Sequence, residues 1–294
     1  MKPNLLIAGG ARCGTAFLHQ SLMDHPGVSG ATGRRPSHFL AYGAGREFHG
    51  PGDALSINRD MLRSVDQWRE MFSTVSNTYV LESSVSTLYG GVDAVDRILG
   101  HCAVGVKIIV VLRDPVQRMV SAHQHLLRQG CETLSLDHAV AAEPARIRDH
   151  WQHGWHYTAM GRYGELLAPF VATFGRDLFI LDHEDLVARP RETLGAVFEW
   201  LNLGEACSLP SLPRRDELEL DGWGRSGCAP ANPWLEKLMG MAPVGLRQWV
   251  EQRRVTQASP EDVRARFRNC FQEDIHRLKG LLPRESWPTW LAAW

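Results

Sequence analysis

The fold is decided by residues 5–18, which read Leu5-Leu6-Ile7-Ala8-Gly9-Gly10-Ala11-Arg12-Cys13-Gly14-Thr15-Ala16-Phe17-Leu18. The apolar start predicts a buried strand, the glycines predict a turn, and a helical pattern begins directly after the turn. This arrangement points backbone N–H groups and the positive end of a helix at one place, where a phosphate binds well. We therefore predict a phosphate site at the end of the first strand; a glycine turn without a ligand is the alternative.

The loop matches only the first half of a nucleotide P-loop. Gly9 and Gly14 have the G-x-x-x-x-G spacing, but Thr15 and Ala16 stand where a Lys-Ser/Thr pair should follow. A cation stands earlier instead, as Arg12 inside the loop. The sequence predicts a phosphorylated ligand that is not bound as Mg-ATP usually is.

Composition excludes several classes of partner. The 32 basic and 33 acidic residues of the 294-residue chain nearly cancel, which argues against bulk binding to nucleic acid or to a membrane surface. We see no signal peptide and no apolar run of the about 18 residues that a membrane span needs. The six cysteines form no CxxC pair, and scattered reduced thiols are typical of a cytoplasmic protein.

Short apolar runs alternate with helical segments along the chain. Residues 104–112 are almost continuously β-branched, as in a strand of a parallel sheet that is covered on both faces. Shorter runs near residue 28 and at 78–81 and 178–181 predict further strands, and the alternation favours an α/β fold with a parallel sheet. We predict one domain over residues 1–294, with long loops at about 30–60 and 208–233 and a helical C-terminal part.

A second motif follows the run at 104–112, and it reads Arg113-Asp114-Pro115-Val116-Gln117-Arg118-Met119-Val120-Ser121. Arg113 emerges at the carboxyl end of a buried strand, where open α/β sheets bind ligands. Pro115 suits the first turn of a helix, and Ser121 lies two turns along. An Arg and a Ser together bind phosphate well. Two strand ends thus present anion sites, as expected for a nucleotide with phosphates at both ends; a solvated helix start is the alternative.

The two motifs, R-x-G-T and R-D-P-x-x-R-x-x-S, resemble those of sulfotransferases that use 3′-phosphoadenosine 5′-phosphosulfate (PAPS). The resemblance continues in His25-Pro26-x-Val28, in Gly161-x-Tyr163 and in the segment from Glu184 to Leu203, and it spans about residues 5–205 in family order. It is closest in style to the bacterial and carbohydrate-type branch. It implies a P-loop NTPase-like fold, a three-layer α/β sandwich with a central parallel sheet.

The resemblance also implies the nucleotide and its contacts. PAPS is the expected co-substrate and PAP the expected product, with no metal ion required. The first loop is expected to hold the 5′-phosphosulfate, with the Arg12 cation offsetting charge on the leaving phosphate, and the second motif to hold the 3′-phosphate. Arg225-Ser226-Gly227 resembles the family's late loop over the 3′-phosphate, with an ordinary polar turn as the alternative. The nucleotide-binding residues predicted in this way are Arg12, Cys13, Gly14, Thr15, Ala16, Phe17, Arg113, Ser121, Arg225, Ser226 and Gly227.

The base that takes the proton of the acceptor has two candidates beside the catalytic Arg12. Carbohydrate-type relatives often carry a Glu two residues before His-Phe, where this chain has Pro36. His38 is the first candidate, because imidazole titrates near neutral pH; a histidine packed under the loop is the alternative. Glu82, which follows a predicted strand, is the second candidate, and it is equally suited to orienting another side chain.

A group of histidines and aromatic residues stands at 150–157. The spacing of the histidines does not match the i, i+4 arrangement of a helical zinc pair, so we predict no metal site. The aromatic neighbours indicate a cleft for the acceptor, formed by loops at about 30–60 and 145–160. The residues concerned are His150, His153, His156, Trp151, Trp155 and Tyr157.

The leading hypothesis is an enzyme that moves a sulfuryl group from PAPS to a hydroxyl or an amine. A P-loop kinase or other NTPase explains the spacing of Gly9 and Gly14 but not the motif from Arg113 to Ser121. A non-catalytic PAP-binding protein is the third hypothesis, suggested by Pro36. The expected partner is a small-molecule or saccharide acceptor; the sequence distinguishes neither among saccharide, lipid, polyketide and phenol nor among oligomeric states.

Overall fold

The computed structural model describes residues 1–31, 36–53, 57–204 and 260–294. Its centre is a sheet of five strands in the order β2-β3-β1-β4-β5, and every neighbouring pair runs parallel. The strands are β1 (Leu5–Gly9), β2 (Val28–Gly30), β3 (Tyr79–Glu82), β4 (Lys107–Leu112) and β5 (Leu178–Asp182). The sequence prediction of a parallel α/β fold is confirmed, and the predicted strands are all present.

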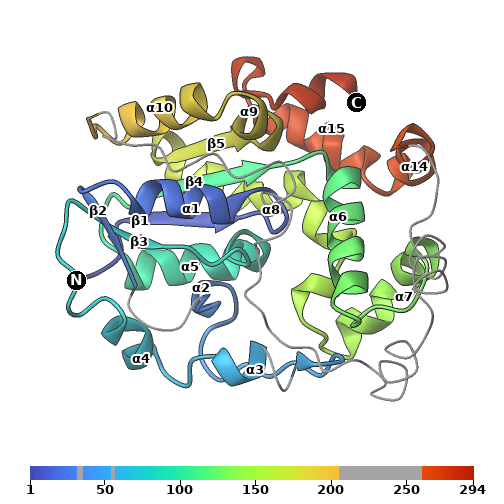
Figure 1. Ribbon diagram of the computed structural model, residues 1–294, viewed down its shortest axis with the longest axis horizontal. Coiled ribbons are helices and arrows are strands. Elements are labelled where there is room, and N and C mark those ends of the chain that lie inside the picture. The colour runs from blue at the N-terminus through green and yellow to red at the C-terminus, as the bar shows by residue number, and fades with distance from the viewer. Residues whose placement is uncertain (32–35, 54–56, 205–259) are drawn as a thin grey trace, which may run out of the picture.

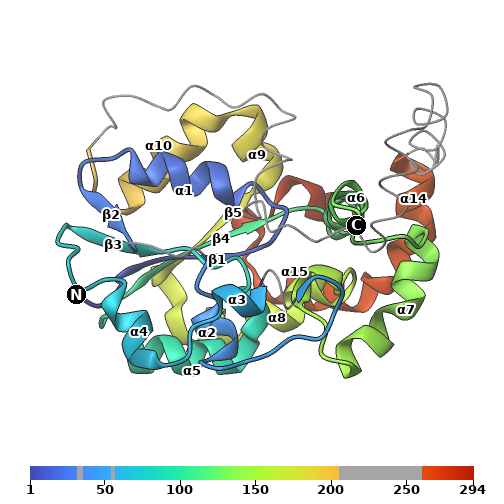
Figure 2. The same ribbon diagram turned by 60° about the horizontal axis from the view of Figure 1, so that its bottom comes forward.

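Helices cover both faces of the sheet (Figures 1 and 2). Three of them, α1 (Thr15–Met23), α9 (His183–Ala188) and α10 (Pro190–Trp200), lie on one face. On the other face lie α2 (Phe39–Tyr42), α4 (Val65–Glu70), α5 (Gly91–His101) and α8 (Tyr163–Phe174). The fold is therefore the three-layer sandwich that the family resemblance implies.

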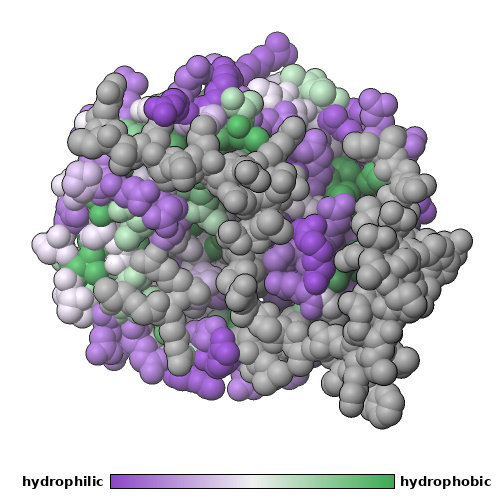
Figure 3. Space-filling model, in the orientation of Figure 1, coloured by the Kyte–Doolittle hydropathy of each residue, from purple (hydrophilic) through white to green (hydrophobic). Residues whose placement is uncertain are grey.

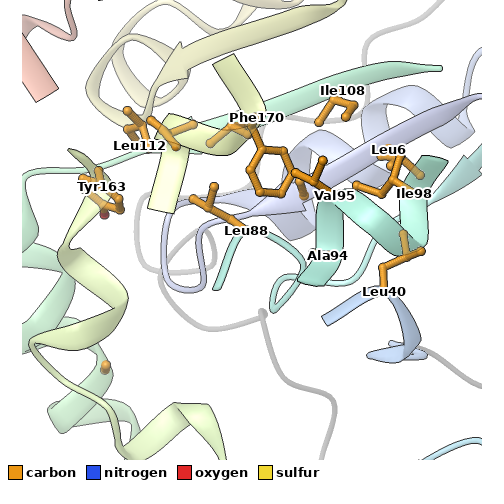
Figure 4. Packing of buried hydrophobic residues seen from close by; sticks show 14 of the residues in the cluster. Leu6, Leu40, Leu88, Ala94, Val95, Ile98, Ile108, Leu112, Tyr163 and Phe170 are labelled. Atoms are coloured by element: carbon orange, nitrogen blue, oxygen red, sulfur yellow. The ribbon is translucent and has the colours of Figure 1, made fainter. Parts of the chain in front are cut away.

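Alternation along the strands explains the two layers of core. Successive side chains of a strand point to opposite faces, so Leu5 and Ile7 pack with α1, α9 and α10, whereas Leu6 and Ala8 pack with the opposite layer. Figure 4 shows part of this second cluster, in which Phe170 of α8 and Val95 of α5 meet the sheet. All four strand side chains are fully buried. Packing on both faces therefore holds β1 in place.

Four further helices lie beside the carboxyl end of the sheet. They are α6 (Pro115–Arg128), α7 (Leu136–Arg148), α14 (Pro260–Phe267) and α15 (Gln272–Leu281). The C-terminal part is helical as predicted, and it ends in the short turns η7 (Arg284–Ser286) and η8 (Thr289–Ala293). The prediction of a single domain over residues 1–294 stays a prediction.

The first long loop contains more regular structure than its composition indicates. Within residues 30–60 the chain forms α2 and a second one-turn helix, α3 (Ile57–Asp60). Both are held by buried apolar side chains, Phe39 and Leu40 in α2 and Ile57 in α3. Such single turns are stabilised by tertiary packing rather than by local propensity. The second predicted loop, 208–233, lies outside the described residues.

The surface gives few further signals. On the face seen in Figure 3 the described residues are mostly hydrophilic, with small separate hydrophobic areas, as is normal for a protein surface.

In the described part of the chain no helix is long and apolar enough to cross a bilayer. Cys13, Cys102 and Cys270 are free thiols. Cys131 is disulfide-bonded, so the expectation of uniformly reduced thiols is wrong at this position.

Candidate functional site

The two predicted phosphate motifs meet at the carboxyl ends of neighbouring strands. After β1 the chain turns toward β2, and after β4 it turns toward β5 on the opposite side, so the crevice between β1 and β4 is the topological switch point where ligands of such sheets bind. Here Arg12 Nε donates to Ser121 Oγ at 3.4 Å, across 109 residues of sequence. Arg113 Nη1 donates to the Arg12 carbonyl oxygen at 3.2 Å.

Backbone conformation gives the first loop its shape. Arg12 has φ 67° and Gly14 has φ 81°, and for an L-residue such as Arg12 this left-handed region is uncommon and costs free energy. Helix α1 begins directly afterwards at Thr15, and no side chain caps it. The loop therefore presents a helix N-terminus without a built-in acceptor, as an anion site requires. Thr15 and Phe17 of the first turn are buried, and Ala16 is half-buried.

The site carries concentrated positive charge with little solvent. Arg12 and Arg113 are 6% and 9% exposed. Cys13, the next residue of the loop, is fully buried, and its Sγ lies 3.9 Å from the Tyr163 hydroxyl. Burial raises the pKa of the Cys13 thiol although Arg118 and Arg113 act to lower it, so Cys13 remains a neutral thiol at neutral pH.

Arg118 has a different position from the other two arginines. It is 1% exposed, and its Nη2 donates to the carbonyl oxygen of Tyr157. This bond ties α6 to the segment at 153–157, which indicates a structural contact for Arg118. Asp114, one residue before the helix, caps it by accepting from Val116 N at 3.0 Å and from Gln117 N at 3.1 Å.

The two candidate bases lie in one buried network next to the phosphate loop. Glu82 ends β3 and accepts from Ser37 Oγ at 2.8 Å, from Ser84 N at 3.2 Å and from Ser84 Oγ. His38 Nδ1 lies 2.8 Å from Ser86 Oγ, and His38 N donates to Ser84 Oγ at 3.1 Å. The carboxylate thus holds the loop from which His38 projects.

Val85 connects this network with the phosphate loop. It belongs to the same small apolar cluster as Ala11, the residue before Arg12. A Cβ on Gly9 would lie 2.9 Å from the Val85 carbonyl oxygen, so glycine is required for the close approach of the two segments. Ser84 and Ser86, on either side of Val85, are the residues that contact His38.

Burial controls the charge of His38. The side chain is 4% exposed, its φ is 53°, and burial lowers its pKa to about 4 although Asp60 acts to raise it. At neutral pH the imidazole is therefore neutral and able to accept a proton. The ring of His153 stands 5.2 Å from it, centroid to centroid.

Two histidines that were not predicted as site residues lie near this site. His125 follows Ser121 by one helical turn of α6, and burial, together with the charges of Arg12 and Arg128, lowers its pKa to about 4. His183 contacts the loop from β5's side, where a Cβ on Gly14 would come within 3.2 Å of its Nδ1. The four-residue spacing from Ser121 was the available signal for His125; His183 gave none.

The aromatic cleft predicted at 151–157 is wrong for its two central residues. Trp155 and Tyr157 are 1% and 0% exposed, and they pack on the guanidinium of Arg146. Arg146 in turn pairs with buried Glu132 at 2.7 Å. These rings belong to the core because a buried ion pair needs close packing around it. Among the described residues no group of three or more His, Cys, Asp or Glu side chains is arranged to hold a metal.

Part of the predicted site cannot be placed. Arg225, Ser226 and Gly227 lie outside the described residues. The described candidates form two adjoining groups, one with Arg12, Arg113 and Ser121 and one with His38 and Glu82.

Comparison with known proteins now bears on this geometry. A family model described as "Sulfotransferase family" matches residues 105–205, which include the whole second motif. The crystal structure of a sulfotransferase from Alicyclobacillus acidocaldarius is 25% identical, covers 96% of both chains and superposes with a TM-score of 0.70. The chain therefore resembles sulfotransferases, in sequence over residues 105–205 and in fold over almost its whole length.

A curated relative of this chain is much larger. It is the bifunctional heparan sulfate N-deacetylase/N-sulfotransferase 1 of Caenorhabditis elegans, 24% identical over 212 residues. The match takes in 69% of this chain, but the chain spans only 22% of the length of that relative. The likeness therefore concerns one portion of the larger protein.

The loop geometry predicts that Gly14→Ala abolishes any thermal stabilisation by PAP, because the new methyl group meets His183 and Leu186 and shifts the loop. Gly45→Ala is the matched control: Gly45 also has positive φ, 72°, but open space around it. Each change should cost about 1 kcal/mol of backbone strain, measured by thermal unfolding with and without PAP. An unchanged PAP shift in Gly14→Ala contradicts the assignment of this loop.

Proposed function

We propose that this protein transfers the sulfuryl group of PAPS to a hydroxyl or amine of a carbohydrate, lipid or natural-product acceptor and releases PAP. The bond from Arg12 to Ser121 carries the proposal, because it joins the loop after β1 to the motif after β4. A nucleotide with a 5′-phosphosulfate and a 3′-phosphate requires two neighbouring anion sites, and these two motifs are neighbours in the fold. The resemblance to sulfotransferases supports the same reaction class.

The residues present fit this nucleotide. Gly14 has no side chain to fill the cradle at the start of α1, and a Cβ there would crowd His183. The helix has no side-chain cap to compete with a phosphate. Arg12 and Arg113 supply charge where burial leaves little water to screen it. Backbone N–H groups at Gly14 to Phe17, the Thr15 hydroxyl and Arg12 are proposed to hold the phosphosulfate.

The second motif is proposed to hold the 3′-phosphate through Arg113 and Ser121. Arg113 is fixed by its bond to the Arg12 carbonyl, and Ser121 by the bond from Arg12. Arg225, Ser226 and Gly227 remain in the proposal on sequence grounds. Arg12 belongs to both halves of the site, which suits it to respond to charge at the leaving phosphate.

PAPS supplies an activated sulfur: its bond to the 5′-phosphate oxygen breaks as a new bond to the acceptor oxygen or nitrogen forms. The Arg12 guanidinium offsets the negative charge that the phosphate gains, an effect commonly worth ~10²–10³ in rate. The acceptor proton passes to a base within hydrogen-bond reach. His38 is our first candidate for this base, and Glu82 is the second.

The network geometry favours His38 over Glu82. The Glu82 carboxylate already accepts hydrogen bonds from Ser37 and Ser84, an arrangement that suits orientation of the loop. Burial lowers the pKa of His38 to about 4, so its ring carries no proton that blocks acceptance at neutral pH, and the same shift makes it a weaker base than a free histidine. We therefore assign Glu82 to positioning the loop and His38 to proton transfer.

The competing functions make different predictions for ligand binding. A kinase or NTPase should be stabilised by Mg-ATP, whereas a sulfotransferase and a non-catalytic PAP-binding protein should be stabilised by PAP and not by Mg-ATP. A thermal-shift series with both nucleotides separates these cases, and the reverse pattern would exclude PAPS. The proposal includes a cytoplasmic location, which the free thiols of Cys13, Cys102 and Cys270 support and the disulfide bond of Cys131 opposes.

Turnover of sulfur-labelled PAPS tests the function directly. The wild-type chain should transfer label to an acceptor in a pooled saccharide, lipid and phenol mixture. Arg12→Ala should reduce kcat by ~10²–10³ while PAP still binds, since Arg12 acts mainly on charge that develops during transfer. Arg69→Ala, which removes a surface arginine paired with Asp66, is the control. Unchanged turnover in Arg12→Ala removes this residue from the mechanism.

The pH profile of kcat/KM should report the buried histidine. With the pKa of His38 near 4, kcat/KM should be level between pH 6 and 8 and fall only as pH approaches about 4, because the base form is lost there. An ordinary histidine would produce the fall near pH 6.5. His38→Ala should reduce kcat/KM by ~10² or more. Activity retained in that variant, with a loss in Glu82→Gln, would move the base to Glu82.

A further inference from the structure

The end of the described chain runs across the same edge of the sheet that carries the phosphate motifs. We call residues Thr289–Trp294 the C-terminal strap. In Figures 1 and 2 the strap's end lies beside the start of α6, the helix that carries Ser121. Its contacts fall on residues that directly follow or end strands β4 and β5.

The first contact is at the end of β5. Thr289 donates from its backbone N at 2.7 Å and from its hydroxyl at 2.5 Å to Asp182 Oδ2. Asp182 Oδ1 accepts from Glu184 N at 3.0 Å and so caps α9. One carboxylate therefore joins the strap to the helix whose first residue, His183, lies against Gly14 of the phosphate loop.

The second contact is at the end of β4. Trp294 Nε1 donates to Asp114 Oδ2 at 2.9 Å, and Arg264 Nη2 of α14 lies 3.3 Å from the same oxygen. The guanidinium groups of Arg264 and Arg268 stand over the Trp294 indole, 5.1 and 5.3 Å from its ring centroid. Asp114 itself is 1% exposed.

Both oxygens of Asp114 are thus in use. Oδ1 caps α6 through Val116 N and Gln117 N, and Oδ2 accepts from the strap. Without the indole, Oδ2 keeps the Arg264 guanidinium at 3.3 Å among its described partners. The carboxylate then moves toward that guanidinium or admits water, because a buried acceptor that loses a donor is costly. Such a movement reaches Arg113, its neighbour in sequence, and Ser121, two turns along the helix that Asp114 caps.

We propose that Trp294 is a positioning residue for the 3′-phosphate site and acts through Asp114 on Arg113 and Ser121. This inference rests on the proposed function. The strap holds the start of α6 at its place beside the phosphate loop, so that the two anion sites keep the spacing of one nucleotide. Trp294 contacts the second motif at Asp114, which carries neither the guanidinium nor the hydroxyl proposed to bind the 3′-phosphate.

The experiment measures the affinities of PAP and of adenosine 5′-phosphosulfate, which lacks the 3′-phosphate, by calorimetry on the full chain. Trp294→Ala should weaken PAP about five- to tenfold and the phosphosulfate less than about twofold, a loss of the size of one ordinary hydrogen bond. Trp294→Phe, which keeps a ring under the arginines but removes the N–H, should show the same selectivity with a smaller loss. Arg113→Ala is the reference for a direct loss of the 3′-phosphate contact.

Trp287→Ala is the matched control. Trp287 also donates from its indole, at 3.0 Å to the Leu282 carbonyl, and also carries cations over its ring. It lies in the same C-terminal region but has no bond to Asp114, so its loss should leave the ratio of the two affinities unchanged.

The outcomes separate the inference from the function on which it rests. Equal losses for both nucleotides in Trp294→Phe, or a change of ratio in Trp287→Ala as large as in Trp294→Ala, overturn the positioning role and leave the proposed function standing. Failure of the wild-type chain to bind PAP overturns the proposed function itself. If Trp294→Ala does not fold, the Trp294→Phe measurement decides.

Discussion

The architecture of the site depends on burying Arg12 between two strand ends. Its backbone adopts a left-handed conformation, its side chain reaches Ser121, and its carbonyl accepts from Arg113. Like charges in a poorly solvated place repel each other more strongly than in water. A ligand with negative charge at both ends lowers that repulsion, whereas an uncharged ligand does not. The arrangement of these two arginines therefore favours a ligand with several negative charges, whatever the acceptor.

Much of this could be predicted because its signals are local. The strands before Gly9 and Arg113 are continuous apolar runs, and the carboxyl ends of neighbouring parallel strands meet at one edge. The same rule predicts that the motifs of Arg12 and Ser121 lie at one site, and these two side chains are in contact across 109 residues. The aromatic residues near 155 gave a wrong prediction for the opposite reason. Composition does not distinguish an exposed aromatic face from one packed on a buried ion pair, and Tyr157 is packed on Arg146.

The acceptor side was less accessible to prediction because it depends on a loop conformation. His38 has a positive φ and meets Ser86 only because Glu82 holds Ser37 and Ser84. None of these bonds follows from spacing in the sequence. Pro36 stands where the resembling carbohydrate-type sequences often have a Glu. The Glu82 carboxylate at the end of β3 nevertheless holds the same segment by accepting a hydrogen bond from Ser37. The loss of one acidic residue therefore need not leave the loop without an anchor.

A buried carboxylate stands at or just beyond the end of three strands. Glu82, Asp114 and Asp182 are buried carboxylates at or just beyond the ends of β3, β4 and β5, and each anchors a distant segment. Their partners are mainly neutral donors: serine and threonine hydroxyls, backbone N–H groups and an indole. Asp114 also pairs with the Arg264 guanidinium of α14. These carboxylates thus fix the segments that surround the carboxyl edge of the sheet. In this arrangement the end of β1, which has glycines and an arginine in place of a carboxylate, becomes the point of attraction for an anion.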